Sequence, residues 1–183
     1  FPYTTLFRSG YLAQDFIETD LRSLWIIATM MVVFGLILGA ADRYASKTKE
    51  LSQLTVKHGV LYGLAQSLAL IPGVSRSGAT IAMGRLLGYS REAALRYSFL
   101  LALPAVFGSG FYQLQNALTE DQVAVYSLAE TFVATAIAFV VGYLVIAWLL
   151  KFVTTKSFAP FIIYRVILGT LLLILLAAGV LQP

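Results

Sequence analysis

The sequence contains no cysteine and only one histidine, His58, in 183 residues. The absence of cysteine excludes a disulfide framework, a thiolate metal site and a cysteine nucleophile, and a lone histidine cannot form a centre held by several histidines. Charged residues are also scarce, at 12% against about 25% in soluble domains. Hydrophobic residues make up 59% of the chain, and its mean hydropathy is +0.82. This balance predicts an integral membrane protein surrounded by membrane lipids.

The net charge of +4 does not indicate a nucleic-acid partner, because no basic stripe with interleaved aromatic residues accompanies it. We use the positions of the charged residues to predict the orientation in the membrane instead.

Residues 1–10 resemble neither a signal peptide nor a spanning helix, and residues 3–9 (Tyr-Thr-Thr-Leu-Phe-Arg-Ser) look like a translated sequencing adapter. We interpret residues 1–10 as a non-native leader and residues 11–183 as a single membrane domain of a protein that extends upstream. A poorly ordered native terminus is the alternative.

Four segments have the length and composition of a membrane span, which needs about 20 mostly apolar residues. Between the first two lies a broken pair of short helices, at residues 58–71 and 78–87, separated by Pro72-Gly73, where the proline stops the first helix. This pair is either one interrupted span or a hairpin that returns to its starting side. The four expected spans are Leu24 to Ala41, Tyr97 to Gln115, Ser127 to Leu150 and Phe161 to Leu181.

The basic residues decide between these two geometries, since Lys and Arg concentrate in cytoplasmic loops. If the pair re-enters, all the basic loops share one face and the acidic loop at 116–126 lies on the other. If it crosses once, basic loops fall on both faces. We therefore predict a re-entrant hairpin at about residues 58–88, with its tip near mid-membrane in a pocket open to the outside. The loop after the first span carries Arg43, Lys47, Lys49 and Lys57, the loop after the broken pair carries Arg85, Arg91 and Arg96, and the loop before the last span carries Lys151 and Lys156.

The hairpin tip carries the run 72–80, Pro-Gly-Val-Ser-Arg-Ser-Gly-Ala-Thr. An arginine near the bilayer centre costs roughly 2.5–3.5 kcal/mol on insertion scales and is rarely there without a partner. No Asp or Glu lies between Glu50 and Glu92, so the missing anion is expected to be a ligand. Arg76 can offer a planar, bidentate fork to a phosphate.

The other residues of the run favour the same kind of ligand. Gly73 and Gly78 allow successive amides to point inward as an anion nest. The second short helix, starting near Ser77, would direct its positive end at the same place. Ser75 and Thr80, with Ser77, add hydroxyl groups, so phosphate or diphosphate fits best. The alternative is that the hydroxyls cap a helix, as Ser77 alone would do, while the arginine snorkels to a headgroup. The run lacks the Gly-Lys-Ser/Thr ending of a P-loop, which argues against a nucleotide.

Residues 66–80 (Gln-Ser-Leu-Ala-Leu-Ile-Pro-Gly-Val-Ser-Arg-Ser-Gly-Ala-Thr) closely resemble the second signature of the undecaprenyl-diphosphate phosphatase family, of the bacitracin-resistance type. The resemblance covers most of residues 24–181. It continues through Gly88, residues 90–94, residues 98–101, Pro104, Tyr164-Arg165 and Gly169.

The resemblance implies an enzyme of the bacterial plasma membrane that removes the terminal phosphate of undecaprenyl diphosphate at the outer face. This regenerates the monophosphate carrier for peptidoglycan and other envelope polymers. It also implies that Arg76 is the essential phosphate-binding arginine, with Ser75, Ser77 and Thr80 in the same pocket, and that a divalent cation (Mg or Ca) takes part. The implied fold is all-α, with four transmembrane helices plus one re-entrant helical hairpin as half of an inverted-repeat architecture. A homodimer is compatible with it.

One family feature has no counterpart here. The family's first half carries two glutamates four residues apart, followed by a hairpin with a serine and a histidine; these groups are thought to supply the nucleophile or base and to organise the metal. No such pair precedes a serine- and histidine-bearing turn in this sequence. We therefore expect this chain to be the C-terminal two-thirds of the enzyme, with the electrostatic half of the site and no activity by itself.

Two further residues are candidates for substrate binding. Arg165, about one turn into the last span, could reach the diphosphate or could snorkel to the interface. Gln66 could line the pocket or could bond across helices. Gly35 and Gly39 suggest close packing of the first span against another helix. A polyprenyl-phosphate transporter or flippase is the alternative function, because opposed broken helices around a midplane anion site also occur in transporters.

Overall fold

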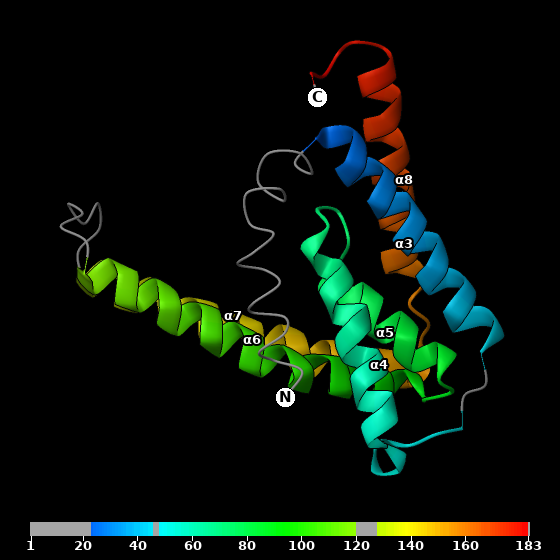
Figure 1. Cartoon of the computed structure of the whole chain (residues 1–183), viewed down its shortest axis with the longest axis horizontal. Helices are drawn as coiled ribbons and strands as arrows, with labels where there is room; N and C mark the ends of the chain where they lie inside the picture. Colours follow the sequence, from blue (N-terminus) through cyan, green and yellow to red (C-terminus); the bar gives the residue numbers. More distant parts are fainter. Residues whose placement is uncertain (1–22, 46–47, 120–127, 183) are drawn as a thin grey trace.

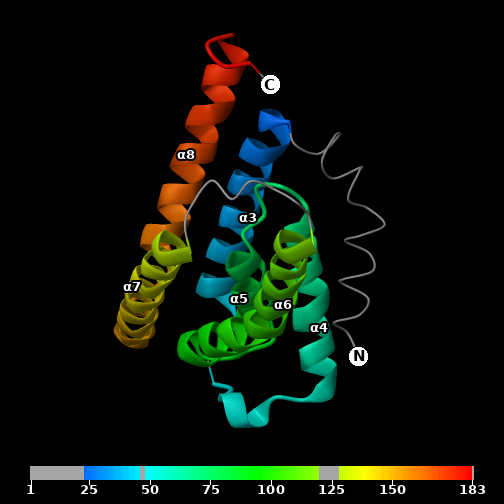
Figure 2. The same ribbon diagram turned by 90° about the vertical axis from the view of Figure 1, so that its left-hand side faces the viewer.

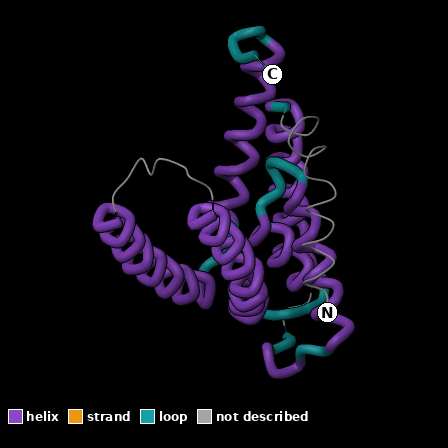
Figure 3. The backbone as a smooth tube through the Cα atoms, turned by 60° about the vertical axis from the view of Figure 1, so that its left-hand side comes forward, coloured by secondary structure: helices purple, strands orange, loops and turns teal. Residues whose placement is uncertain are grey.

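The computed structural model describes residues 23–45, 48–119 and 128–182. These residues form helices joined by loops, with no strand among them, which confirms the all-α prediction (Figures 1 and 3). The helices are α3 (Leu24–Tyr44), α4 (Val56–Ser67), α5 (Arg76–Leu86), α6 (Arg91–Thr119), α7 (Leu128–Thr155) and α8 (Ala159–Ala177), with short 3₁₀ turns η1 (Leu51–Gln53) and η2 (Leu68–Leu70). The leader that we assigned to residues 1–10 lies outside the described residues.

The four expected spans correspond to α3, α6, α7 and α8, each long and apolar enough to cross a membrane. The helix that we expected from Tyr97 begins earlier, at Arg91, because the Ser90 hydroxyl accepts the amide of Ala93 at 3.2 Å, a hydrogen bond typical of a helix N-cap. The last helix ends at Ala177 rather than Leu181, since Gly179 follows with a φ of +71° and closes the helix. Side-chain capping and glycine geometry thus set both boundaries.

The broken pair is a helix–turn–helix in which α4 and α5 lie side by side (Figure 1). The second helix begins at Arg76 rather than Gly78, because Ser75, and not Ser77, is its N-cap: the Ser75 hydroxyl accepts the Gly78 amide at 3.1 Å. Between the helices, Gly73 has a φ of +89°, which only glycine adopts without strain. The hairpin connection is therefore as expected, while its re-entry into the bilayer and its depth there stay predictions.

Glycines allow α3 and α8 to pack closely, as Gly35 and Gly39 suggested. A Cβ atom at Gly35 would lie 3.0 Å from Val166 Cγ2 of α8. On the other helix, a Cβ at Gly169 would lie 2.9 Å from the carbonyl oxygen of Ala28 in α3. The two helices run alongside each other in both ribbon views (Figures 1 and 2). Small residues on both partners therefore set the distance between the two helices.

The hairpin runs along α3 and is fixed at both ends. At the turn, a Cβ on Gly73 would lie 2.3 Å from the Ile27 carbonyl oxygen, so the turn touches the first part of α3. At the other end, Arg85 of α5 pairs with Asp42 near the end of α3 at 3.1 Å. The tip of the hairpin therefore lies at the end of α3 opposite to Asp42.

The helices α6 and α7 lie side by side and project away from the α3–α8 pair (Figures 1 and 3). Side chains along the described part of α7 are almost all exposed. Because these side chains are strongly apolar, this surface needs lipid or other helices around it.

Candidate active site

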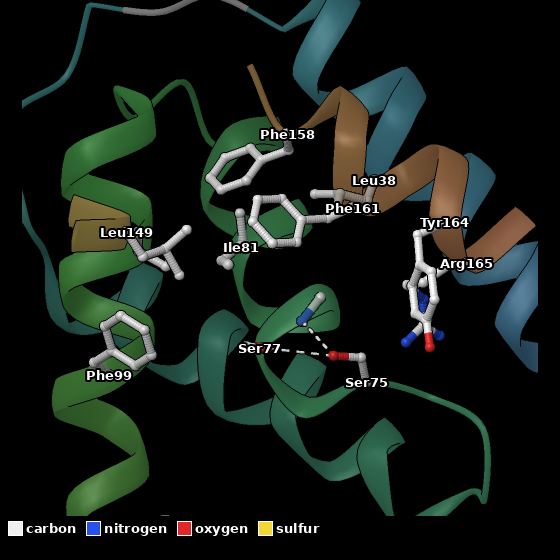
Figure 4. A pocket seen from close by; sticks show the side chains of 12 residues that line it. Leu38, Ser75, Ser77, Ile81, Phe99, Leu149, Phe158, Phe161, Tyr164 and Arg165 are labelled. Atoms are coloured by element: carbon white, nitrogen blue, oxygen red, sulfur yellow. Dashed lines mark hydrogen bonds between the residues drawn. The ribbon is translucent and has the colours of Figure 1, made fainter. Parts of the chain in front are cut away.

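A cavity of about 300 Å³ opens where the start of α5 faces α8 (Figure 4). One part of its wall is polar and comes from the hairpin tip and the second turn of α8. The rest is apolar and comes from α3, α5, α6, α7 and the start of α8. The polar wall holds Ser75, Ser77, Gly78, Tyr164 and Arg165, and the apolar wall holds Leu38, Ile81, Leu95, Phe99, Leu149, Phe158 and Phe161.

The two serines are held by the start of α5. The hydroxyl oxygens of Ser75 and Ser77 lie 3.3 Å apart, and that of Ser75 also accepts the Gly78 amide (Figure 4). Gly78 leaves room for this cap, because a Cβ there would lie 3.1 Å from the Ser75 Cβ. The first amides of a helix and its positive dipole end attract anions. The serines thus mark the place at which an anion would meet the start of α5.

Arg165 brings a cation to the same pocket. One of its terminal nitrogens donates to the Gly73 carbonyl oxygen at 2.7 Å, which links α8 to the hairpin turn. Its side chain is only partly exposed, and it lines the cavity beside Tyr164. The structure places Arg165 in the wall of the cavity, and its contact with a diphosphate stays a prediction. The carbonyl oxygen of Gly73 accepts this hydrogen bond, while the substrate-binding role that we expected for Gly73 stays a prediction.

Arg76 is not among the residues that line the cavity, although Ser75 and Ser77 on either side of it are. Its side chain is exposed as the first residue of α5. Arg76 therefore does not contribute to the cavity wall. Its role as the essential phosphate-binding residue stays a prediction.

Thr80 and Gln66 are buried and do not line the cavity either. The Thr80 hydroxyl donates to the Arg76 carbonyl oxygen at 2.9 Å and also pairs with the Ser98 hydroxyl of α6. This geometry makes Thr80 a link between α5 and α6 rather than a contact for a ligand in this cavity. The Gln66 side chain is 4% exposed, and its amide oxygen has no hydrogen-bond partner among the described residues.

Sequence reasoning missed a buried ion-pair cluster formed by Asp42, Arg85 and Arg91. Arg91 binds both carboxylate oxygens of Asp42, at 2.8 and 2.9 Å, and Arg85 binds one of them at 3.1 Å. We had assigned both arginines to a basic loop, whereas Arg85 is a fully buried residue in the last turn of α5. The available signal was Asp42 itself, a carboxylate at the end of an apolar segment, which needs a partner when buried.

The described residues do not fit the divalent cation that the family resemblance implies. Among them, no three His, Cys, Asp or Glu side chains lie close enough to hold a metal ion. Asp42, the one buried carboxylate in the described part of the chain, already pairs with two arginines. No step of the chemistry below therefore passes through a metal.

The fold and this cavity define a helical integral membrane protein with a pocket that is polar at a hairpin tip and apolar elsewhere. The chain belongs to the family described as "Bacitracin resistance protein BacA", whose model matches residues 4–171. The resemblance seen in residues 66–80 is thereby confirmed.

Several curated relatives are closely similar to this chain. It is 60% identical over 174 residues to an undecaprenyl-diphosphatase of Pseudarthrobacter chlorophenolicus, and the aligned region covers 94% of this chain and 63% of that protein. It is 59% identical to the undecaprenyl-diphosphatase of Micrococcus luteus, with the same coverage. It is 56% identical to undecaprenyl-diphosphatase 2 of Agrobacterium fabrum, covering 94% of this chain and 62% of that protein. The chain thus spans about three fifths of the length of the curated relatives it matches.

Proposed function

We propose that the protein containing this chain hydrolyses undecaprenyl diphosphate to undecaprenyl phosphate and inorganic phosphate. The observation that carries this proposal is the two-part wall of the cavity. Hydroxyls, a helix start and the Arg165 guanidinium gather at one end, next to a lining of leucine, isoleucine and phenylalanine side chains. A diphosphate attached to a long hydrocarbon has the same two parts. Three close relatives carry the name of this activity.

In the proposed reaction a water oxygen attacks the terminal phosphorus, and the bond from that phosphorus to the bridging oxygen breaks. Negative charge grows on the phosphoryl and leaving oxygens in such transfers. Arg165 and the first amides of α5 stabilise that charge, and Ser75 and Ser77 donate hydrogen bonds to the same oxygens. Arg165 also holds the turn in place through the Gly73 carbonyl oxygen. The apolar wall excludes water from the prenyl chain, so the diphosphate is presented in one orientation.

We further propose that the protein lies in the bacterial plasma membrane with this pocket facing outward, where it recycles the lipid carrier for peptidoglycan synthesis. Two observations support the orientation. The basic loops lie at the Asp42 end of α3, and the hairpin tip lies at the opposite end, against Ile27. A divalent-cation requirement, with carboxylate ligands outside the described residues, and a homodimer remain proposals taken from the family resemblance, as does the phosphate-binding role of Arg76.

The experiment replaces the aligned region of the Pseudarthrobacter relative with this chain and measures phosphate release from undecaprenyl diphosphate in detergent. The chimera, its Arg165→Gln variant and this chain alone are compared. Release by the chimera that falls in the variant supports the phosphatase. Release by this chain alone would contradict our expectation that it lacks part of the catalytic machinery. A chimera that binds the diphosphate and moves it across vesicles without releasing phosphate would overturn the phosphatase in favour of the transporter.

A further inference from the structure

A second hollow, of about 660 Å³, lies between the end of α3 and the start of α8. It is separate from the candidate active site because it uses other faces of the same helices. On α8 the active-site cavity takes residues 158, 161, 164 and 165, whereas this hollow takes residues 159, 162 and 163. The lining residues of the hollow are Gly39, Asp42, Arg43, Tyr44, Arg91, Ser157, Ala159, Ile162 and Ile163.

The charges around this hollow do not balance. Asp42 supplies one negative charge, which Arg85 and Arg91 already share. Arg43 adds a third guanidinium, and its nearest described ring partner is Tyr44, at 6.0 Å from the ring centroid. No ion pair in residues 23–45, 48–119 and 128–182 involves Arg43. Arg85 is fully buried and does not line the hollow, so the lining itself holds two guanidiniums, Arg43 and Arg91, against the one carboxylate of Asp42. This excess of positive charge favours an anionic ligand.

The rest of the hollow is apolar. Ile162 and Gly39 form the floor where α8 meets α3, and Ile163 is 55% exposed beside them. Tyr44 is 81% exposed at the end of α3, a position in which tyrosine commonly marks the membrane interface. A small soluble anion would use the arginines alone and leave this apolar surface in water. A phospholipid would use both.

The position along the helices agrees with such a ligand. Arg43 lies in the last turn of α3, at the end where the basic loops gather. That end is the one we expect to be cytoplasmic, where anionic lipids attract basic residues, and basic pockets between spanning helices bind lipid headgroups.

We propose that this hollow binds the phosphate headgroup of an anionic phospholipid, with Arg43 and Arg91 on the phosphate and an acyl chain along Gly39 and Ile163. The shared chemistry is a phosphate anion, and the source to which we commit is lipid. The proposal is independent of any reaction at the α5 cavity.

The test measures the thermal unfolding midpoint of this chain in detergent after titration with phosphatidylglycerol, with phosphatidylcholine or with inorganic phosphate. Arg43→Gln is compared with Lys57→Gln, which removes an exposed lysine outside the hollow. We expect phosphatidylglycerol to raise the midpoint most. We expect Arg43→Gln to weaken its apparent affinity about fivefold, which corresponds to about 1 kcal/mol for one arginine near an anionic surface. Arg43→Lys should restore most of the effect, because it restores the charge.

Three outcomes would overturn the proposal. An equal shift with phosphatidylcholine would mean that bulk lipid, and not the headgroup charge, stabilises the chain. An equal shift with inorganic phosphate would make the hollow a site for free phosphate. Equal losses in Arg43→Gln and Lys57→Gln would mean that net charge alone attracts the lipid. Because Arg43 is exposed and makes no ion pair in the described residues, its variant is expected to fold.

Discussion

Two side chains support the turn at the hairpin tip in different ways: Ser75 caps α5, and Arg165 reaches the turn from α8. Arg165 is the only arginine among the described residues that line the active-site cavity. We therefore expect Arg165→Gln, built into the chimera, to lower kcat/KM by about 10²–10³, the usual loss when one charge-stabilising donor is removed. The control is Arg96→Gln, an exposed arginine whose ion pair is with Glu92. Equal losses in both variants would contradict a specific role for Arg165.

The structural roles of Ser75 and Ser77 can be distinguished by how much each alanine variant destabilises the chain. Ser75→Ala removes the hydrogen bond to the Gly78 amide and should destabilise the chain by about 1 kcal/mol, the usual cost of losing a helix cap. Ser77→Ala removes only a 3.3 Å contact with the Ser75 hydroxyl and should leave the unfolding midpoint nearly unchanged. Thermal unfolding in detergent measures both. A larger loss for Ser77→Ala would show that the cap is assigned to the wrong serine.

The sequence showed which residue types gather at the hairpin tip, but not which contacts they make. Serines and glycines next to an arginine predicted an anion site because such residue types have few other uses inside an apolar segment. Which arginine lines the cavity depends on a contact between Arg165 and Gly73, 92 residues apart, and periodicity carries no information on such a pairing. The contact of the Thr80 hydroxyl with Ser98 of α6 could not be predicted for a related reason, because it forms only once the helices pack.

At the scale of helices, the contact of α3 with α8 positions Arg165. A Cβ at Gly169 would lie 2.8 Å from Val32 Cγ2 and 2.9 Å from the Ala28 carbonyl oxygen. Gly169→Ala should therefore separate the helices and destabilise the chain by about 1–3 kcal/mol, as overpacking does. The matched control is Gly142→Ala in α7, where a Cβ meets nothing within 4 Å. It should be neutral or stabilising by up to about 1 kcal/mol, because alanine favours the helix.

The Asp42 ion-pair cluster joins three helices at the other end of the hairpin. Asp42→Asn leaves the fully buried guanidinium of Arg85 without its counter-charge. Removing one member of a buried pair typically costs about 3–5 kcal/mol, so the variant should unfold well below the wild-type temperature. Glu92→Gln breaks the exposed pair with Arg96 and should cost at most about 1 kcal/mol. Similar midpoints for the two variants would mean that the cluster does not hold α5 and α6 to α3.

The helix boundaries show where local pattern suffices. Hydropathy located all four long helices and proline located the turn, because both signals depend on consecutive residues. The starts of α5 and α6 were misplaced by a few residues because Ser75 and Ser90 act as caps only in one backbone conformation. Gly35 and Gly39 predicted that α3 packs closely against another helix, but one sequence could not identify that helix as α8.

At the scale of the whole molecule, the orientation in the membrane rests on whether the hairpin returns to its starting side. The chain has no cysteine, so each single substitution introduces the only thiol. We place that thiol at three exposed positions: Ser52 before α4, Lys156 after α7 and Ala178 after α8. An impermeant maleimide added to intact cells then reports which positions face outward.

If the hairpin re-enters, only α6 and α7 cross the membrane between Ser52 and Lys156. These two positions then lie on the same, cytoplasmic face, so the thiols of Ser52→Cys and Lys156→Cys should be protected from the maleimide. Ala178→Cys, one crossing further along α8, should react. If the α4–α5 pair crosses once instead, one more crossing separates Ser52 from the rest, so Lys156→Cys reacts while Ser52→Cys and Ala178→Cys are protected together. Permeabilised cells, in which all three thiols react, control for accessibility. Only the first pattern places both sides of the hollow, Arg43 on α3 and Ser157 before α8, on the cytoplasmic face, with the tip of the hairpin toward the outside.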